Sequence, residues 1–578
     1  MKRLLLITGF VFYLLNPGFA QNYNPLQIPD TLVGPTFELN MIDTFRQFFP
    51  GQQTITSGFN GNWWGPTLIM QKGESVQMYV HNHLNDSTTV HWHGLHLPAV
   101  MDGGPHQIIP PGTTWSPYWK VDNAAATYFY HPHLHEMTEK QLVHGLGGFL
   151  IVRDSAEAAL KLPRTYGVDD IPLAITDRKF TSDNQFRYTD AHYGDTVIVN
   201  GVMNASATLP AQVVRFRLLN VAQERAYLIG LSDNRNFWVI GGDGGLLDTP
   251  VVMNRLLMGV AERYEILVDL TGMEGKELKL MAFNASLETD VNGSEPVNTP
   301  APFGNKLGRR NFMILHFKIA AKTNNPVTNI PSQLIPNTQL DTADVVKQRQ
   351  VVLGDEPNQN IFNVRSWLDG RFFKFDRIDH YVPLDNTEIW AIKDESAGSH
   401  PFHIHDVQFR IVDINGAPPP AHRAGWKDVV YVRRNTTVRF ITKFSDFADT
   451  IKPFMYHCHI LFHEDEGMMA QFLVVPPGFQ IPADSTSAVI SPVQNTNYPI
   501  EVFPNPASSV LFFKGPQDAG MYYADVFNEL GYNVLRVPGP DAENGINISF
   551  LPQGTYFIRF TDQKKRMYIA QFLKLSRE

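Results

Sequence analysis

The sequence predicts an all-β chain built from several β-sandwiches. Short segments that alternate apolar and polar residues, such as 75–80 and 437–442, are separated by clusters of Gly, Pro, Asn and Asp, the pattern of sandwich strands and their turns. Long helical periodicity is hard to find. At about 150 residues per domain, the 578 residues correspond to three or four domains.

The N-terminus has the three parts of a secretory signal peptide. Lys2 and Arg3 precede an almost wholly apolar run at residues 4–15, and the segment ends on Ala20. A membrane-spanning helix would need about 20 apolar residues, and no other segment is apolar enough to cross a bilayer. We therefore expect residues 1–20 to be removed and the chain to be exported.

One order of parts occurs twice along the chain, which is how an internal repeat appears in a sequence. Residues 76–152 and 388–475 each run strand, loop, His-x-His, a gap, a second His-x-His and a closing strand. Residues 165–320 have similar strands but no His-x-His, so they resemble a third copy without a metal role. The predicted sandwich domains are residues 21–155, 156–322 and 345–477.

Polar segments separate these parts. Residues 320–350 and 476–496 are rich in polar residues and Pro and are predicted linkers, while 286–311 is predicted to be a long loop within the middle domain. Strand patterns resume in residues 498–578, which contain neither His nor Cys. We expect a small C-terminal β-sandwich that takes no part in metal chemistry.

The chain's only cysteine lies in a run of metal-binding residue types. His457, Cys458 and His459 are followed by His463 and Met468, and thiolate, imidazole and thioether are the soft ligands of a blue-copper electron-transfer site. His457 and His459 point to the opposite side of an extended strand from Cys458, so they are free to bind a second metal centre. A lone cysteine can also be simply a small buried hydrophobic residue. The metal-binding residue types around Cys458 argue against that interpretation.

Four His-x-His pairs offer eight imidazoles for that second centre. In a strand, the two imidazoles of each pair lie on one face, with backbones about 6.6–7 Å apart. Imidazoles without paired carboxylates favour copper over calcium, magnesium or non-haem iron, and a structural zinc site would use four closed ligands. His400 remains as the second imidazole for the Cys458 site, and His135 offers an alternative partner for His133. The pairs are His91/His93, His131/His133, His403/His405 and His457/His459.

These clusters resemble those of multicopper oxidases over about residues 35–477. Residues 91–95, 101–105, 400–405 and 421–428 look closest to bacterial copper-efflux oxidases and bilirubin oxidases. The resemblance implies three cupredoxin-like Greek-key sandwiches and four copper ions: one type 1, one type 2 and a type 3 pair. It assigns His400, Cys458, His463 and Met468 to type 1, His91 and His403 to type 2, and His93, His131, His133, His405, His457 and His459 to type 3.

The resemblance also implies an activity. A small phenol-type reductant gives up electrons one at a time at the type 1 site, the chain carries them from Cys458 to its flanking histidines, and dioxygen becomes two waters. Asp102 and Glu464 occupy positions that the family uses for proton delivery; the alternative is that they are ordinary solvated carboxylates. Met469 could replace Met468 as the axial ligand, but the spacing favours Met468.

Other functions compete with this one. A cuprous-ion or other metal oxidase in copper tolerance is the first alternative, but residues 318–400 lack the methionine-rich insert of copper-efflux oxidases. A copper-free relative that acts as a binding or cell-division protein would have lost ligands, whereas all twelve side chains are present here. Copper storage is a third possibility.

The C-terminal part is similar to the sorting domain of the type 9 secretion system of Bacteroidota, through residues 502–506, 551–556 and 572–574. This implies that the secretion machinery is a partner, that the protein passes from the periplasm to the cell surface or medium, and that the tail is removed. The alternative is an accessory sandwich that binds carbohydrate or a partner. The net charge of −9 argues against nucleic acid, and we expect a monomer that uses dioxygen with a small reductant or metal ion.

Overall fold

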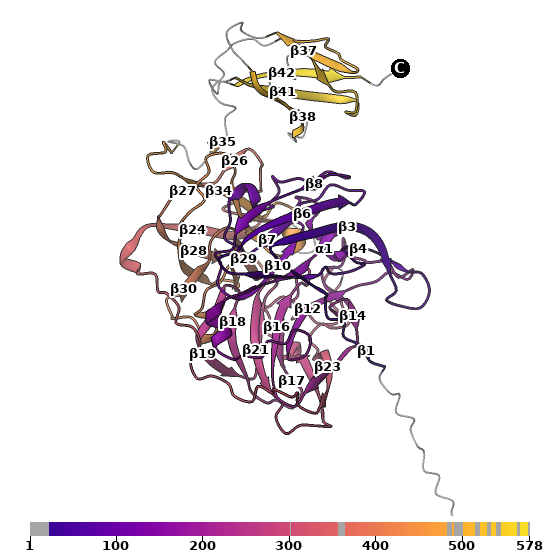
Figure 1. The fold of residues 1–578 in the computed structure, drawn as a ribbon, viewed down its shortest axis with the longest axis vertical. Helices are drawn as coiled ribbons and strands as arrows, with labels where there is room; N and C mark the ends of the chain where they lie inside the picture. Colours follow the sequence, from indigo (N-terminus) through magenta and orange to yellow (C-terminus); the bar gives the residue numbers. More distant parts are fainter. Residues whose placement is uncertain are drawn as a thin grey trace, which may run out of the picture. The chain divides into compact units, whose positions relative to one another are not determined.

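The computed structural model describes residues 22–300, 302–356, 365–481, 488–489, 501–514, 521–528, 533–538, 545–562 and 567–575. The predicted signal peptide lies outside the described residues. The chain divides into two compact units, Met1–Ser487 and Ala488–Glu578. Strands make up most of the regular secondary structure in both, which confirms the all-β prediction (Figure 1). No helix among the described residues is long and apolar enough to span a membrane.

The first sandwich has two sheets that share one apolar core, which includes Leu39, Met78 and Leu150. One sheet contains, in spatial order, β2 (Thr31–Val33), β5 (Thr67–Gln71), β11 (Gly148–Arg153), β10 (Ala126–His131) and β7 (His91–His93). The other contains β4 (Thr54–Phe59), β3 (Thr36–Arg46), β6 (Ser75–His83) and β8 (Thr114–Trp115), with β9 (Tyr118–Lys120) also paired to β6.

The sandwich near the end of the first unit repeats this plan around a core that includes Trp390, Phe402 and Cys458. One sheet contains β27 (His380–Pro383), β34 (Met469–Val475), β33 (Phe454–Cys458), β29 (His400–Ile404) and β31 (Val429–Val432). In this sheet β34 is parallel to β27 and antiparallel to β33, and β33 is antiparallel to β29. The first sandwich has the same arrangement: β11 is parallel to β5 and antiparallel to β10, and β10 is antiparallel to β7. The other sheet of the later sandwich contains β25 (Ser366–Leu368), β24 (Val345–Asp355), β28 (Thr387–Asp394), β32 (Thr437–Lys443) and β30 (Phe409–Ile414), and β26 (Arg377–Ile378) precedes β27.

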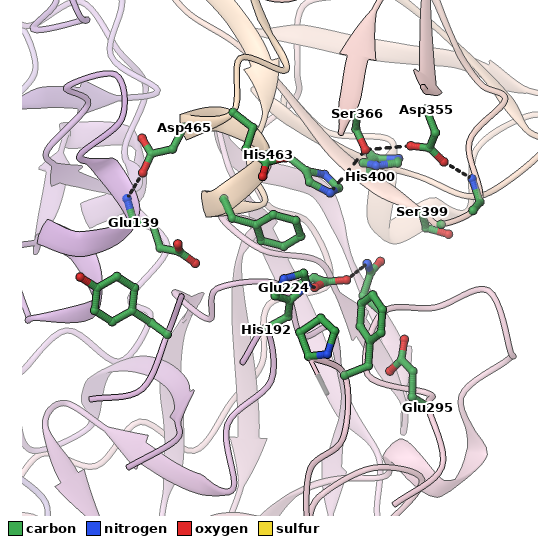
Figure 2. A pocket seen from close by; sticks show the side chains of 18 of the residues that line it. Glu139, His192, Glu224, Glu295, Asp355, Ser366, Ser399, His400, His463 and Asp465 are labelled. Carbon is green, nitrogen blue, oxygen red and sulfur yellow. Dashed lines mark hydrogen bonds and ion pairs between the residues drawn. The ribbon is translucent and has the colours of Figure 1, made fainter. Parts of the chain in front are cut away.

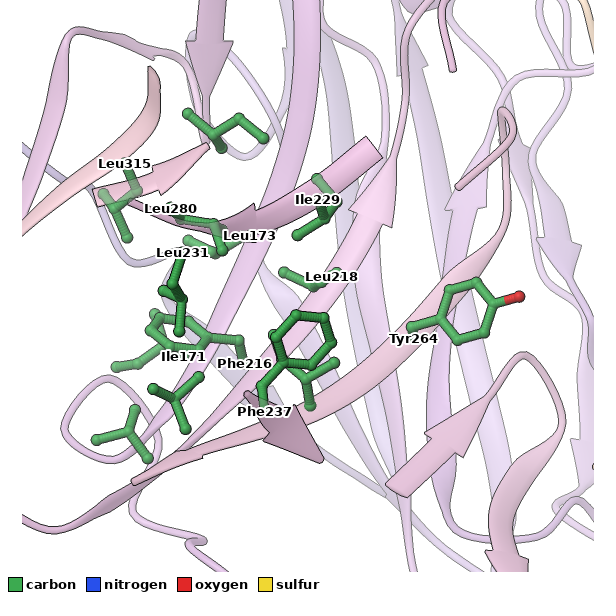
Figure 3. Close-up of a cluster of buried hydrophobic side chains, with 14 of the residues drawn as sticks. Ile171, Leu173, Phe216, Leu218, Ile229, Leu231, Phe237, Tyr264, Leu280 and Leu315 are labelled. Carbon is green, nitrogen blue, oxygen red and sulfur yellow. The ribbon is translucent and has the colours of Figure 1, made fainter. Parts of the chain in front are cut away.

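The middle sandwich packs two larger sheets around a core that includes Ile171, Phe216 and Leu315 (Figure 3). One sheet contains β1 (Asn24–Pro25), β15 (Ala205–Pro210), β23 (Phe312–Ala320), β22 (Glu277–Ala282), β17 (Tyr227–Leu231) and β20 (Leu256–Met258). The other contains β14 (Val202–Met203), β13 (Thr196–Val199), β12 (Asp170–Arg178), β16 (Val213–Asn220), β21 (Arg263–Asp269), β18 (Phe237–Gly242) and β19 (Gly245–Met253).

The first strand lies in an unexpected place. Although the first predicted domain starts at residue 21, β1 pairs in parallel with β15 of the middle sandwich. The backbone of β15 would otherwise be open on that side, and an unpaired edge strand readily accepts another strand. Periodicity along the sequence does not reveal such an exchange, because it reports burial and not the pairing partner.

Helices are few and short. They are α1 (Thr138–Val143), α2 (Ser155–Ala159) and α3 (Leu461–Asp465), with single 3₁₀ turns at Ala99–Met101, Asn284–Ser286, Thr342–Asp344 and Ala421–Arg423. The described residues between 287 and 311 contain neither helix nor strand, as the predicted loop requires. The linker predicted at 320–350 ends earlier, because β24 starts at Val345. The second linker falls partly outside the described residues.

The C-terminal unit is a small sandwich whose core includes Leu511, Val526 and Phe560. Its strands are β36 (Glu501–Phe503), β37 (Val510–Lys514) and β40 (Ile546–Asn547) in one sheet, and β39 (Asn533–Pro538), β38 (Met521–Asn528), β41 (Gly554–Asp562) and β42 (Met567–Lys574) in the other; β35 (Ala488–Val489) comes before them.

A buried network of ion pairs joins the first sandwich to the middle one. Arg217 donates to the two carboxylate oxygens of Asp170 at 2.7 and 3.0 Å and to Glu265 at 2.6 Å. Arg153, at the end of β11, donates to the same Asp170 at 2.8 Å. Burial alone would raise the pKa of Asp170, but Arg217, Arg215 and Arg153 together lower it to about 2. The stability that this carboxylate contributes is therefore present above its unfolded pKa of 3.8 and is lost as the pH falls toward 2.

We expect Arg217→Met to lower the free energy of unfolding by about 3–5 kcal/mol, because it leaves Asp170 and Glu265 as buried charges without this partner. Denaturant unfolding of the copper-free chain would measure the change. Arg187→Met is the control: Arg187 pairs with Asp190 on the surface, and exposed pairs contribute little. A loss of equal size in both variants would contradict a special role for the buried network.

Candidate metal centre

The eight histidines of the four pairs meet where the first and third sandwiches face each other. His131 is the cross-strand partner of His91, and His403 is the cross-strand partner of His457. All eight are buried, with at most 2% of any of them exposed. Only His91 and His93 lie wholly within a strand, because β10, β29 and β33 end inside the other three pairs. The prediction that both imidazoles of a pair lie on one face of a strand therefore applies only to His91 and His93. In the other three pairs the second histidine follows the end of the strand.

The imidazole rings of the two sandwiches interleave. His91 stacks on His405, and His93 on His403, each with ring centroids 3.8 Å apart. His133 and His457 bring their Nε2 atoms within 3.1 Å of each other. The two halves of the repeat thus build one continuous histidine cluster.

Backbone carbonyls fix which ring nitrogen faces the centre of the cluster. His91 Nδ1 donates to the carbonyl of Asp102 at 2.9 Å, and His403 Nδ1 donates to the carbonyl of Asp428 at 2.8 Å. The Nε2 atoms of both rings are buried without a hydrogen-bond partner, as are both ring nitrogens of His459. Buried nitrogen atoms without partners are unfavourable unless they bind something, and an oriented imidazole with one free nitrogen is the usual form of a metal ligand.

The electrostatics of the cluster also suit a metal. Burial, followed by repulsion between neighbouring imidazoles, lowers the pKa of these rings well below its ordinary value, so they are neutral at pH 7 and keep a lone pair for coordination. This holds for His93, His131, His133, His403, His405 and His459. Burial lowers the pKa of His457 to about 3. The donor set therefore fits several metal ions that prefer imidazole.

The nitrogen atoms gather in groups whose members all lie within 4.8 Å of one another. The groups are His91/His93/His131, His91/His403/His405 and His133/His405/His457. A fourth group adds the Asp428 carboxylate to His93 and His403. Because His91 and His405 each belong to two of these groups, the groups form one continuous set of candidate ligands.

Asp428 acts on His93 from the outer side of the cluster. Its Oδ1 lies 3.1 Å from His93 Nε2 and accepts a hydrogen bond from Arg263 Nη1 at 2.7 Å. His93 consequently turns Nδ1 inward, 3.3 Å from His131 Nε2. Arg263 belongs to β21, so the middle sandwich, which has no His-x-His, still contacts the centre indirectly. The sequence predicts a role for neither residue, although Asp428 lies in one of the stretches that carry the family resemblance.

Asp102 and Glu464 take matching positions on the cluster, and both are buried rather than solvated. Asp102 lies 2.7 Å from His405 Nδ1 and 3.4 Å from His91 Nδ1. Glu464 lies 3.2 Å from His133 Nδ1 and 3.4 Å from His457 Nδ1. Each carboxyl group therefore spans one histidine from each sandwich. Burial raises the pKa of Glu464 well above its ordinary value.

The other predicted site surrounds Cys458. His400, Cys458 and His463 offer ligand atoms within 4.8 Å of one another, with Cys458 Sγ 3.8 Å from His463 Nδ1. Asp394 accepts a hydrogen bond from His400 Nδ1 at 2.8 Å, leaving His400 Nε2 as the free nitrogen. Burial raises the pKa of the Cys458 thiol well above its ordinary value, so ionisation of this sulfur requires a compensating cation.

The choice between two methionines follows from their packing. Met468 shares a buried core with Cys458, and its carbonyl accepts a hydrogen bond from the Cys458 N–H at 3.1 Å. Met469 packs instead with Phe373 and Met455. Of the two methionines, Met468 is therefore the one that packs in the core of the Cys458 site.

A cavity of about 960 Å³ lies beside the Cys458 site. His400 and His463 lie on one side of it, and His192, Glu224 and Glu295 lie on another (Figure 2). His463 is 8% exposed, whereas Cys458 and Met468 are completely buried. The loop after residue 286 forms part of the cavity wall, a role that the sequence did not indicate.

Comparison with known proteins agrees with this geometry. The multicopper oxidase family matches residues 44–157 and 342–478, and the secretion system C-terminal sorting domain matches residues 501–573. A multicopper oxidase of Staphylococcus haemolyticus is 32% identical over 74% of this chain and 86% of its own length. The structure of a laccase-like multicopper oxidase from Ochrobactrum sp. superposes with a TM-score of 0.70 at 34% identity, covering 78% of this chain and all of the other.

The relatives also include proteins described by another role. The cell division protein FtsP of Xenorhabdus nematophila is 31% identical over 76% of this chain and 89% of its own length. The matches nevertheless cover both His-x-His sandwiches and a C-terminal sorting domain. The chain belongs to the multicopper oxidase family and is a copper-dependent oxidoreductase with dioxygen as its acceptor.

Proposed function

We propose that this protein couples four one-electron oxidations of a small organic reductant to the reduction of one dioxygen to two waters. The single observation that carries the proposal is the position of Cys458. Cys458 is next to His463, which lines the cavity, and peptide bonds join Cys458 directly to His457 and His459 of the histidine cluster. A short covalent route therefore connects the place where a reductant can bind with the place where dioxygen can be reduced.

The ligand roles proposed are those that the family resemblance implies. His400, Cys458, His463 and Met468 would hold a type 1 copper, and His91 and His403 a type 2 copper. The type 3 pair would be held by His93, His131, His133, His405, His457 and His459. Four copper ions, when bound, supply the one-electron redox chemistry and the dioxygen-binding site.

The chain's own residues supply the remaining requirements. Burial excludes water from the cluster, the carbonyls of Asp102 and Asp428 orient His91 and His403, and His463 lines the cavity. Reduction of dioxygen consumes four protons, and the carboxyl groups of Asp102 and Glu464 lie next to the histidines, where those protons are needed. Glu464 suits this role because its raised pKa favours the protonated form.

We also propose the organisation predicted from the sequence: cupredoxin-like domains at 21–155, 156–322 and 345–477, after a cleaved signal at 1–20 and before a sorting domain at 498–578. The sorting-domain match supports export. We propose a periplasmic intermediate and a final location at the cell surface or outside the cell, as a monomer.

Copper loading gives the first test. The fully loaded chain should contain four copper ions, show an intense blue Cu–thiolate absorption band, and consume dioxygen with a phenolic dye. Removal of copper by a chelator should abolish the band and the dioxygen consumption together. A loaded chain that oxidises no dye would contradict the laccase-like proposal, and faster turnover of Cu(I) than of dye in the same preparation would favour the cuprous-ion alternative.

A further inference from the structure

The cavity beside His463 is strongly acidic. Its wall carries a single lysine against nine carboxyl side chains, among them Glu224, Asp290 and Glu295. Several of these have partners: Asp290, for example, pairs with Arg433, which is not among the lining residues. Burial raises the pKa of Glu139, Glu295 and Asp465 to about 7, so these three carry only part of a negative charge at neutral pH. The negative charge of the others still favours a cation over an anion inside the cavity.

One part of the wall holds carboxylate oxygens without a hydrogen bond. Glu224 is 7% exposed; its Oε1 accepts hydrogen bonds from Tyr193 at 2.7 Å and Asn292 at 2.9 Å. Its Oε2 makes no hydrogen bond, although it lies 3.3 Å from Nδ1 of His192. Oε1 of Glu295 lies 3.1 Å from the hydroxyl of the same tyrosine, whose single proton is shared between the two carboxyl groups, and Oε2 of Glu295 is buried without a partner.

These two carboxyl groups form a site to which a cation can bind. The hydrogen bonds from Tyr193 and Asn292 fix the orientation of Glu224. Burial opposes ionisation of Glu224, but His192, Tyr193 and Asn292 together lower its pKa, so Glu224 is ionised. Burial and this neighbouring charge raise the pKa of Glu295 to about 7. A bound cation would stabilise the ionised form of both. We call Glu224 and Glu295 the carboxylate pair.

Aromatic rings connect the carboxylate pair with the Cys458 site. The ring of Phe462 lies 3.8 Å from that of His192 and 4.3 Å from that of His463, measured between centroids. Phe303 contacts His192 from another direction, with centroids 5.1 Å apart. A planar aromatic molecule can therefore lie against Phe462 while a positive group attached to it reaches the carboxylate pair.

Resting on the function proposed above, we propose that the cavity selects aromatic reductants that carry a positive charge, with the carboxylate pair binding the cationic group and Phe462 contacting the ring. Each substrate molecule loses one electron and one proton, and four of each convert one dioxygen into two waters. A bare metal ion fits less well. Among the described residues, every group of three or more metal-binding side chains lies in the histidine cluster or at Cys458, whereas a cavity of about 960 Å³ has the size of an organic ligand site.

Matched substrates test this selectivity. Three phenols would share one ring and differ only in an ethyl arm that ends in trimethylammonium, methyl or sulfonate. With the copper-loaded chain at low ionic strength, we expect kcat/KM for the ammonium compound to exceed that for the sulfonate by about tenfold or more, the size expected from one charge-assisted contact. The preference should shrink as salt is added.

Two variants locate the selectivity. The double variant Glu224→Gln, Glu295→Gln should bring the ratio close to one, mainly by raising KM for the ammonium compound and with a smaller effect on the neutral phenol, and its blue band shows whether the Cys458 site is intact. Glu295→Gln alone, at a less buried position, should give a smaller change in the same direction and serves if the double variant folds poorly. Glu288→Gln removes the same charge from a neighbouring residue that does not line the cavity and should keep the ratio of the unmodified chain.

The outcomes separate this inference from the proposed function. Oxidation of the neutral phenol with no preference between the charged ones would overturn the cation proposal and leave the oxidase proposal intact. If the double variant keeps the same kcat/KM ratio as the unmodified chain, the role of the carboxylate pair is overturned. Oxidation of none of the three phenols would contradict the oxidase proposal itself.

Discussion

Replacing Cys458 with serine should abolish the blue absorption band and reduce dye oxidation to background. The hydroxyl group keeps the size of the side chain but is not a soft thiolate ligand. Without a copper site at position 458, the covalent route to His457 and His459 has no electron donor at its start. Absorption spectra, copper analysis and dioxygen consumption would be measured on one preparation of the variant.

The same variant should retain the copper of the histidine cluster, because none of the eight imidazoles is changed. We therefore expect it to lose about one copper in four. Met469→Leu is a useful control, since Met469 packs away from the Cys458 core and its replacement should leave the band in place. Dioxygen reduction at full rate in Cys458→Ser would refute the proposed electron route.

Glu464→Gln should slow dioxygen reduction by about 10²-fold or more, the range in which a positioned acid or base contributes to catalysis. The amide has the same shape and can still contact His133 and His457, so copper should remain bound, but it cannot release a proton. Stopped-flow kinetics would separate two steps: bleaching of the blue band by reductant without dioxygen, and its return when dioxygen is added.

We expect only the second step to become slow. Glu395→Gln, which removes an exposed carboxyl group that pairs with Lys393, should leave both steps unchanged. Slowing of bleaching alone would instead indicate damage at the cavity side of the molecule, and equal rates in Glu464→Gln and the unmodified chain would remove Glu464 from the proton route.

The sequence predicted the fold class and the grouping of the metal-type side chains because these signals are local. A His-x-His pair or the run around Cys458 is complete within a few residues, and strand alternation reports burial directly. Partners that lie far away in sequence left no such signal. Arg263 reaches Asp428 across 165 positions, and the pairing of β1 with the middle sheet depends on which sheet edge is open.

The cavity was also beyond the reach of sequence patterns. Glu224 and Glu295 come from a turn and a long loop with no periodicity, and single glutamates are common on any surface. Only the fold brings them next to His192 and Phe462. The turns at the ends of β10, β29 and β33 were also not predictable from sequence patterns, because these strands end where the fold brings the chain to the cluster.

The histidine cluster also constrains how this protein can mature. His133 and His457, whose Nε2 atoms meet in the cluster, are 324 positions apart along the chain, and contacts of such long sequence separation form late in folding. The cluster therefore binds metal tightly only after the first and third sandwiches have met, whereas the Cys458 site lies within the third sandwich alone. Metal uptake by the cluster consequently marks the end of folding: in a misassembled chain its histidines remain isolated pairs, and only a completed chain gains the stability that metal bound in the cluster adds to the native state.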